Sequence, residues 1–582
     1  MESSADAEIP QTPRLISVSV TQPKRLTVDL PAGFVARTFL GIEDKQDPND
    51  LNAAAESKEE QWKPRRPEYL VMATLSFISL LVALDATVLI PALPVISHSL
   101  NGSAIETFWA GTSYLLASTV FQPTLSALSD IFGRRELLLV SISLFTLGTV
   151  VACVATNFTQ LLAGRSVQGI GGGGIIAMVL VIFTDIVPLR QRPKYISFVQ
   201  MAWALGTVSG PLAGGLIAEN TTWRWIFYLN FPFCAIGLVV VSLVVKLEMA
   251  RSSLKSKLLR VDWLGSAIFI PGMTSFLIAI TWGGVQFPWA SAQTLIPLFL
   301  GAAGILATLL WERWGATNPF IRPLVFKSRS AVAAYAGAII QGLMLYGQFY
   351  NIPLYLESVQ GLSLTMVGVH LFPISFAMLP AGAMVGILAS RTGHFRWAVW
   401  SGWCVTILGG GLLILLDANT RPVSWLFIFV VAGLGHGMLL SAQNITAQAT
   451  CSPQDSAFAA AMYAFMRGLG ITLGVAIGGT VFENTLSSSL SNVGLPKEIS
   501  QNATTYILKL RTLPVDSPLR LRLLQAYSKA FQRVFQVMTG IGLFGGFLSL
   551  LIGSHSMDKG LDSGHVLRRK DRDTHSVWSG YA

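Results

Sequence analysis

The sequence predicts an all-α membrane protein with about 14 transmembrane helices. Two observations lead to this fold class. Charged residues make up 12% and hydrophobic residues 52% of the 582 residues, whereas a soluble globular chain carries about 25% charged residues. The apolar residues also occur in blocks about 20 residues long, the length that a helix needs to cross about 30 Å of hydrocarbon. A lipid bilayer is therefore the surrounding that this composition fits.

Polar residues, glycines and prolines divide the chain into candidate spans, numbered here in chain order. They cover residues 70–94, 108–128, 137–155, 161–186, 196–217, 226–246, 264–283, 294–312, 331–353, 366–389, 397–416, 423–445, 457–482 and 535–554. Residues 1–67 are polar and contain no basic segment followed by an apolar core, so we expect a disordered cytosolic tail rather than a cleaved signal peptide.

The positions of Lys and Arg predict the side that each loop faces. Basic residues precede span one and follow spans two, four, six, eight and ten, whereas the loops between these are poor in positive charge. Because cytoplasmic loops carry the excess of Lys and Arg, both termini are predicted to be cytosolic. The segment 483–534 carries basic residues yet is predicted to lie outside, since long loops are largely exempt from this rule.

Four glycosylation sequons agree with this topology, because each lies on the predicted outer side. They begin at Asn101, Asn157, Asn220 and Asn502. A fifth sequon, at Asn444, lies inside span 12 and is interpreted as a chance match.

Three charged residues lie within predicted spans and away from their last residues: Asp85 in span one, Arg165 early in span four and Arg467 in span 13. A charge at the centre of a bilayer costs about 2.5–3.5 kcal/mol, so each of them needs a reason. Asp85 and Arg165 either face a water-filled cavity and take part in proton or substrate coupling, or pair to hold two helices in register. The sequence leaves both interpretations open.

Several other classes of function are disfavoured. The net charge of +10 comes from basic residues in short loops, which argues against a nucleic-acid partner. The four cysteines are far apart and no HExxH motif occurs, so no metal site is expected. The stretch 169–174 fits GxGxxG but lies within a span, and no GxxxxGK[ST] motif is present, which disfavours a dinucleotide cofactor and ATP-driven transport. No catalytic constellation is found, so we predict neither an enzyme nor a cofactor.

Five stretches, in this order along the chain, resemble the major facilitator superfamily and its 14-span drug:proton antiporter branch. These are the LDATVLIPALP sequence at 84–94, SALSDIFGRR at 126–135, RSVQGIG at 165–171, GTVSGPLAGG at 206–215 and WRWIFYLN at 223–230. The resemblance extends over about residues 68–555. In its overall character the sequence is similar to fungal pumps that export toxins and secondary metabolites.

The resemblance implies two pseudo-symmetric bundles of six helices and one inserted helix pair. The boundaries expected from it are 68–250 for the N-terminal bundle, 251–328 for the linker and inserted pair, 329–555 for the C-terminal bundle with its long outer loop at 483–534, and 556–582 for a cytosolic tail.

It also implies roles for particular residues. Asp85 and Arg165 would couple proton movement to transport. A conformational switch on the cytosolic side would comprise Asp130, Gly133, Arg134, Arg135 and Asp185. The antiporter motif would comprise Gly206, Gly210, Pro211, Gly214 and Gly215, with Pro211 kinking span five as a hinge.

A substrate pocket between the two halves should be lined by polar and aromatic side chains. The candidates are Gln168, Trp203, Gln341, Tyr346, Tyr350, Asn351, His436, Gln443, Asn444, Tyr463, Phe465 and Arg467. Packing explains each of them individually as well as a pocket does. As a set they suggest a mostly apolar, aromatic cavity.

The expected function is export of small, largely hydrophobic molecules such as a toxin, drug or secondary metabolite in exchange for protons. A proton-coupled importer of a siderophore or nutrient on the same fold is the alternative, and a membrane enzyme or a non-transporting receptor fits the motifs less well. We expect a monomeric, multi-pass protein of the plasma membrane, with the vacuolar membrane as the alternative, whose partners are the substrate, protons and lipid.

Overall fold

The computed structural model describes residues 62–248, 253–284, 286–501, 503–514, 516–560 and 566–567. Almost all of the predicted N-terminal tail and much of the predicted C-terminal tail lie outside these residues. The described chain from Lys63 onward belongs to one compact unit.

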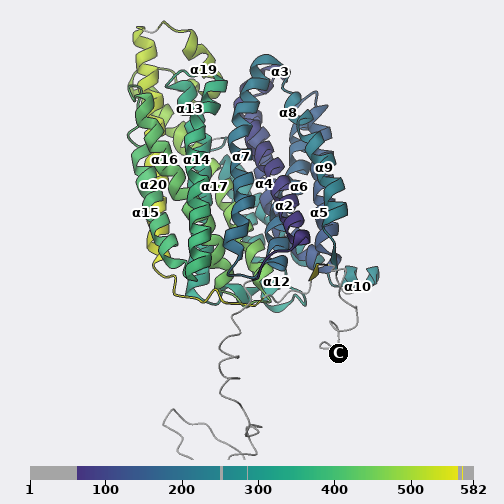
Figure 1. The fold of residues 1–582 in the computed structure, drawn as a ribbon. Coiled ribbons are helices and arrows are strands. Elements are labelled where there is room, and N and C mark those ends of the chain that lie inside the picture. Colours follow the sequence, from purple (N-terminus) through teal and green to yellow (C-terminus); the bar gives the residue numbers. More distant parts are fainter. Residues whose placement is uncertain are drawn as a thin grey trace, which may run out of the picture. The chain divides into compact units, whose positions relative to one another are not determined.

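Long helices make up the first part of this unit (Figure 1). In chain order the elements are α2 (Arg66–Val88), the 3-10 turn η2 (Ile90–Ala92), α3 (Leu93–Ser99), α4 (Ala104–Phe132), α5 (Arg134–Cys153), α6 (Phe158–Ile186), α7 (Arg192–Asn220), α8 (Trp225–Tyr228), α9 (Asn230–Val244), β1 (Leu247–Glu248), α10 (Leu254–Leu259), α11 (Trp263–Trp282) and α12 (Ala292–Trp314).

The second part is built in the same way. Its elements are η3 (Pro323–Phe326), α13 (Arg329–Ser358), α14 (Leu364–Thr392), α15 (Arg396–Leu413), α16 (Pro422–Ala449), α17 (Ser456–Asn492), α18 (Glu498–Gln501), α19 (Ala503–Thr512), α20 (Pro518–Ser549) and β2 (Val566–Leu567). The two short strands pair antiparallel.

The predicted all-α membrane fold is confirmed. Eleven helices in the described part of the chain are long and apolar enough to cross a membrane. Predicted spans two, 11 and 14 coincide with α4, α15 and α20, which are long helices outside this set. The total of 14 spans therefore stays a prediction.

The segment 483–534, predicted as an outer loop, is largely helical, because α17 continues to Asn492 and α20 begins at Pro518. Its bounds relative to the membrane stay a prediction. Only the short helices α18 and α19 and their connections lie between α17 and α20. Leu486 and Leu490 of α17 are buried in one cluster with Tyr527 and Phe531 of α20. These turns pack against protein rather than lipid, so their mixed polar sequence did not read as a membrane span.

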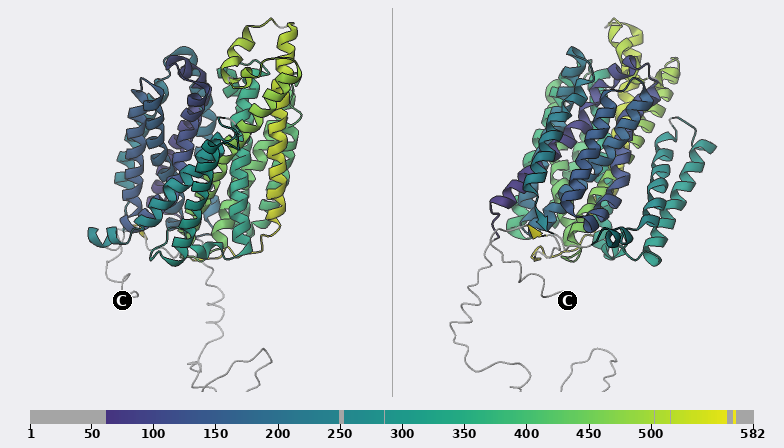
Figure 2. Two further views of the ribbon diagram at one scale, coloured as in Figure 1. Left: turned by 180° about the vertical axis from the view of Figure 1, so that it is seen from behind. Right: turned by 90° about the vertical axis from the view of Figure 1, so that its right-hand side faces the viewer.

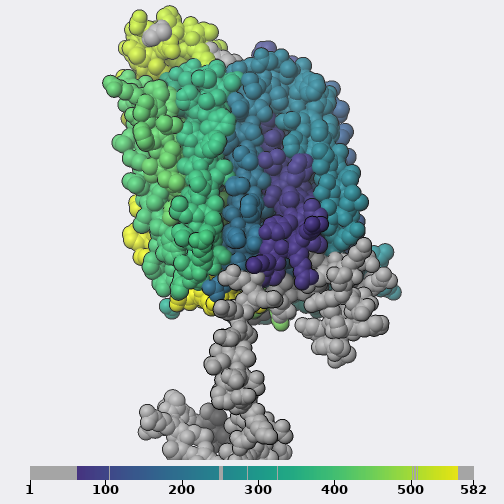
Figure 3. All heavy atoms as spheres, viewed as in Figure 1, coloured from purple at the N-terminus to yellow at the C-terminus, as the bar shows by residue number. Residues whose placement is uncertain are grey.

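The helices pack as two groups that meet along a seam. Helices α2 and α4–α9 contact mainly one another, as do α13–α17 and α20. Across the seam α7 packs on α14, and α4 and α6 pack on α17; Figure 3 shows blue α7 and green α14 meeting on one face. Helices α11 and α12 pack on each other beside the groups, and α11 contacts α4 and α17 (Figure 2).

A row of glycines on α7 allows α2 to approach it closely. Gly206, Gly210 and Gly214 all face α2, and a Cβ atom added at Gly214 would lie 2.0 Å from the carbonyl oxygen of Val88. Membrane helices associate through such small residues, because apolar burial from lipid supplies no drive. Pro211 lies inside α7, which is one helix from Arg192 to Asn220. The predicted motif therefore positions α2.

We expect Gly214→Val to lower the free energy of unfolding by about 1–3 kcal/mol, because the added methyl groups force α2 and α7 apart. The measurement is the melting temperature of the purified protein in detergent. Gly411→Val is the matched control, since no atom lies within 4 Å of a Cβ added there. Equal melting temperatures for the two variants would contradict the close contact between α2 and α7.

Candidate functional site

Asp85 and Arg165 form an ion pair in the interior of the first helix group. Asp85 of α2 is 0% exposed and Arg165 of α6 is 1% exposed. Arg165 Nη1 donates to Asp85 Oδ2 at 2.7 Å. The other carboxylate oxygen, Oδ1, accepts from Gln168 Nε2 at 2.9 Å and from Asn230 Nδ2 at 2.6 Å. Three donors from α6 and α9 thus hold one carboxylate of α2.

The guanidinium of Arg165 is held as firmly as its partner. It donates to Gln168 Oε1 at 2.7 Å and to the carbonyl oxygen of Ala110 in α4 at 3.3 Å, and its carbon lies 4.4 Å from the centre of the Tyr114 ring. Burying two charges costs desolvation energy, and their attraction repays it only when extra hydrogen bonds satisfy the remaining donors and acceptors. Removing one partner of such a pair costs about 3–5 kcal/mol. The two predicted coupling residues are therefore brought together within one helix group.

Sequence reasoning missed two members of this network. Asn230 was noticed only as the last residue of a motif, and Thr149, whose hydroxyl accepts from Gln168 Nε2 at 2.9 Å, was not considered. The signal for Asn230 was present, since an amide in an apolar span needs a hydrogen-bond partner as a charge does. For Thr149 no signal existed, because a threonine can satisfy its hydroxyl within its own helix.

Three of the predicted switch residues meet at one end of the bundle. Arg134, at the start of α5, lies 2.5 Å from Asp130 Oδ1 and 3.0 Å from Asp185 Oδ2. Gly133 joins α4 to α5 with a φ of 118°, a value that favours glycine. Arg135 contacts a different helix: its Nη2 donates to the carbonyl oxygen of Ser242 in α9 at 2.6 Å. Its role in a switch stays a prediction.

At this same end, polar side chains join the two helix groups across the seam. Arg192 of α7 donates to Gln448 Oε1 of α16 at 2.8 Å and to Ser456 of α17. Arg322 lies 2.9 Å from Asp455 and 3.7 Å from Asp130. We refer to these side chains as the latch, which comprises Asp130, Arg192, Arg322, Gln448, Asp455 and Ser456. Arg192 and Arg322 had been used only to predict topology.

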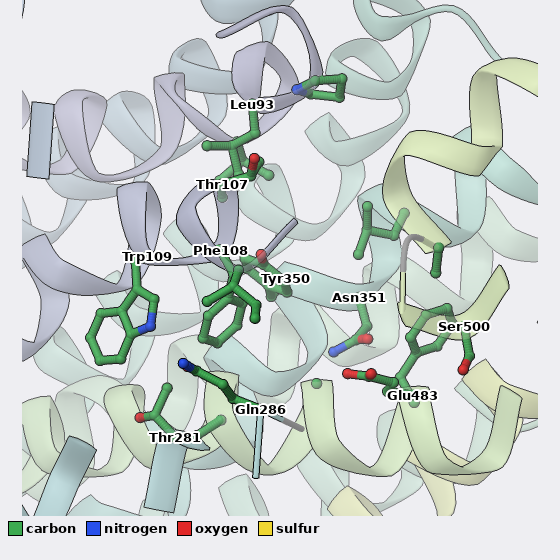
Figure 4. A pocket seen from close by; sticks show the side chains of 18 of the residues that line it. Leu93, Thr107, Phe108, Trp109, Thr281, Gln286, Tyr350, Asn351, Glu483 and Ser500 are labelled. Carbon is green, nitrogen blue, oxygen red and sulfur yellow. The ribbon is translucent and has the colours of Figure 1, made fainter. Parts of the chain in front are cut away.

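A cavity of about 400 Å³ lies at the opposite end, which we refer to as the cavity end (Figure 4). Its lining comes from α4, α11, α13, α17 and α19 and so from both helix groups. The predicted residues Tyr350 and Asn351 line it, together with the carboxylates of Glu357 and Glu483. This volume lies within the range of about 300–1,000 Å³ of small-molecule sites. Polar groups in mostly apolar walls suit an organic molecule.

A second, smaller pocket of about 30 Å³ lies along the same α4, α13 and α17 seam. Three predicted residues line it: Trp203, Tyr346 and Arg467. Tyr346 and Tyr350 stand one turn apart on α13, so the inner pocket begins about 6 Å from the cavity along that helix.

The remaining pocket candidates line neither of these two spaces. They are Gln168, Gln341, His436, Gln443, Asn444, Tyr463 and Phe465. Several contact neighbouring helices instead: His436 Nε2 lies 3.0 Å from Gln348 Oε1, and the Tyr463 hydroxyl donates to the carbonyl oxygen of Leu440. The ring of Phe465 packs against Phe269 of α11. Packing is therefore the better interpretation for them in this conformation.

The described glycosylation candidates lie at the cavity end. Asn101, Asn157 and Asn220 are exposed at the ends of α3, α6 and α7 that lie away from the latch. Asn502 lies outside the described residues. Three sequons on one end agree with the topology predicted from the basic residues.

Comparison with known proteins gives the class of this protein. The Major Facilitator Superfamily pattern matches residues 75–475, and the chain belongs to this superfamily. It is a multi-pass membrane transporter rather than an enzyme. The predicted resemblance to fungal transporters is confirmed by relatives from Phoma and Aspergillus.

Among its relatives is the MFS transporter L2 of Phoma sp., 41% identical over 90% of this chain and 88% of that protein. The MFS efflux transporter aclA of Aspergillus oryzae is 35% identical over 73% of this chain and 77% of its own length. Among solved structures, the human organic anion transporter MFSD10 aligns with a TM-score of 0.53 at 15% identity, covering 83% of this chain and all of that one. At this identity the likeness concerns the fold alone.

The latch should loosen by very different amounts when its two arginines are replaced. Arg192 is 5% exposed, and hydrogen bonds of a charged group contribute about 1.5–3 kcal/mol. Arg322 and Asp130 are each 36% exposed, and such ion pairs contribute about 0.2–1 kcal/mol. We therefore expect Arg192→Gln to raise the equilibrium constant for opening this end about 10-fold or more. Arg322→Gln, which loses partly exposed pairs with Asp130 and Asp455, should raise it less.

The reporter is Cys451, which lies between α16 and α17 beside the latch. Burial raises the pKa of its thiol to about 11, so it reacts slowly while the latch is closed. Its rate of maleimide labelling is measured in a protein whose three other cysteines are replaced by serine. Arg421→Gln, an exposed change at the start of α16, is the control. Identical labelling rates in all variants would refute the latch.

Proposed function

We propose that this protein exports small, largely hydrophobic organic molecules in exchange for protons. One observation carries the proposal: the buried carboxylate of Asp85 is paired with Arg165, and this pair lies between a cavity at one end of the bundle and the latch at the other. A transporter needs access from one side at a time, and a latch with an opposite cavity provides it.

Asp85 is suited to couple the proton to this change of access. While it is ionised, its charge offsets Arg165 and its oxygens satisfy the amides of Gln168 and Asn230. Protonation removes the negative charge and leaves Arg165 a buried cation without a counter-ion, which is costly in this interior. The conformation that hydrates Arg165 is then favoured. A membrane potential of 100 mV adds about 2.3 kcal/mol for each proton that enters.

Two further observations support export. Relatives at 35% and 31% identity are called an efflux transporter and an efflux pump. The cavity lining combines the aromatic rings of Phe108, Trp109 and Tyr350 with polar groups that include Asn351, Glu357 and Glu483 (Figure 4). Such walls suit aromatic or terpenoid skeletons better than sugars.

The orientation follows from the same elements. We infer that the latch end is cytosolic and that the exposed Asn101, Asn157 and Asn220 face outward, where they receive glycans. A monomer in the plasma membrane, with a substrate path between two six-helix bundles, completes the proposal. Resistance of the producing cell to the exported compound would be its biological result.

The proposal predicts that Asp85→Asn abolishes efflux that depends on the proton gradient, because an amide cannot gain and lose a proton as a carboxyl group does. Accumulation of fluorescent hydrophobic compounds, with neutral, cationic and anionic members, is measured in expressing cells with and without a protonophore. The wild type should accumulate at least one compound less, and only while the gradient persists.

Since Asp85→Asn leaves Arg165 without a counter-ion, the double variant Asp85→Asn/Arg165→Gln serves as the folding control. It should reach the wild-type surface level and yet transport nothing. Higher accumulation with the wild type would identify an importer. Efflux that continues in the double variant, or that ignores the protonophore, would refute proton coupling through Asp85.

A further inference from the structure

Arg467 is a half-buried cation that has no ion-pair partner within the described chain. It lies in the middle of α17 and lines the inner pocket. Its Nε and Nη2 atoms are sealed from solvent and have no hydrogen-bond partner. Among the described residues no carboxylate oxygen lies within 4 Å of its nitrogens, whereas Arg134, Arg165 and Arg322 all have one.

Asp85, a carboxylate on a helix that lines this pocket, is already engaged. Asp85 belongs to α2, whose residues Val82 and Ala86 line the same pocket, but both of its oxygens accept from Arg165, Gln168 and Asn230. The ring of Trp203 lies 5.8 Å from the Arg467 guanidinium carbon, and this contact is weak compared with an ion pair. Two guanidinium nitrogens that are sealed without a hydrogen-bond partner carry a desolvation cost, which an anion bound in this pocket would offset.

The size of the pocket limits that anion to a small group. Its volume of about 30 Å³ is small, since a cavity needs about 10–15 Å³ on such a measure to hold one water molecule. A carboxylate fits there, whereas a whole organic molecule does not. Gln122 in the lining presents an amide that can donate a second hydrogen bond. The other residues of the lining with polar groups are Tyr114, Ser118, Thr119, Trp203 and Tyr346.

The body of the ligand has a place next to this pocket. An apolar cluster that includes Phe108, Tyr346 and Tyr350 separates the inner pocket from the 400 Å³ cavity, and the rings of Phe108 and Tyr350 meet edge to face at 6.4 Å. Rotation of these rings joins the two spaces. A ligand with an apolar skeleton and one acidic group then places the skeleton in the cavity and the acid at Arg467.

We propose that the substrates of this transporter are hydrophobic carboxylic acids, recognised as anions by Arg467. This inference extends the proposed export function. It rests on that proposal in calling the bound acid a transported substrate. The recognition itself is a binding property and is testable without transport. Arg favours a carboxylate because its planar fork can form two parallel hydrogen bonds with both oxygens.

The test compares two acids with their own methyl esters on the purified full-length protein at neutral pH. The probes are 1-pyrenebutyric acid and abietic acid, and binding is followed by the ligand-dependent rise in melting temperature. The wild type should bind at least one acid about 10-fold or more tightly than its ester, because only the acid offers a charge to Arg467.

Arg467→Gln should bind the acid and the ester equally, while Arg467→Lys should keep part of the preference because it keeps the charge. Arg421→Gln, which removes an exposed arginine at the start of α16, should behave as the wild type. A wild type without preference for either acid, or a preference that survives in Arg467→Gln, overturns the proposal.

Transport of the same pairs separates this inference from the proposed function. Export of esters as fast as acids, sensitive to a protonophore, would leave proton-driven efflux standing and overturn the role of Arg467. Acid-selective binding that depends on Arg467, without any protonophore-sensitive efflux, would support the anion site and refute the export mechanism.

Discussion

The buried pair of Asp85 and Arg165 imposes the constraint on which the rest of this structure depends. Two charges in the interior of a membrane protein are tolerated only when every donor and acceptor is satisfied. Helices α2, α4, α6 and α9 must therefore meet closely enough for Gln168, Asn230 and the Ala110 carbonyl to reach the pair. Glycines of α6 contribute to this, because Gly169 and Gly173 let α6 lie against the backbone of α4.

The same electrostatic reasoning distinguishes the charges that hold the fold from those that act in transport. The Asp85 network lies within one helix group, so its hydrogen bonds can stay intact while the two groups move relative to each other. The latch joins the two groups and therefore has to break, and its bonds include partly exposed ion pairs of modest strength. Arg467 differs from both, since two of its nitrogens are sealed at the seam without an anionic partner among the described residues. A charge left in that state is the clearest sign of a ligand.

Much of the fold and part of the site could be read from the sequence, because bilayer crossing demands long apolar helices and makes interior charges conspicuous. Asp85, Arg165 and Arg467 stood out for this reason, and so did the Asp130 and Arg134 loop. Hydropathy was a poorer guide where a helix continues but packs against protein. The end of α17 and the start of α20 are helical, yet they bury Leu490 and Tyr527 against each other rather than in lipid.

The sequence by itself determined the class of fold, the approximate places of the helices and which interior charges require an explanation, since these follow from local composition. Only the tertiary structure decided which side chains meet. Arg134 reaches Asp185 while its neighbour Arg135 reaches α9, and His436 binds Gln348 rather than lining a pocket. Such pairings depend on the rotation of each helix about its axis. That rotation is set by packing between residues far apart in the chain, which no local pattern encodes.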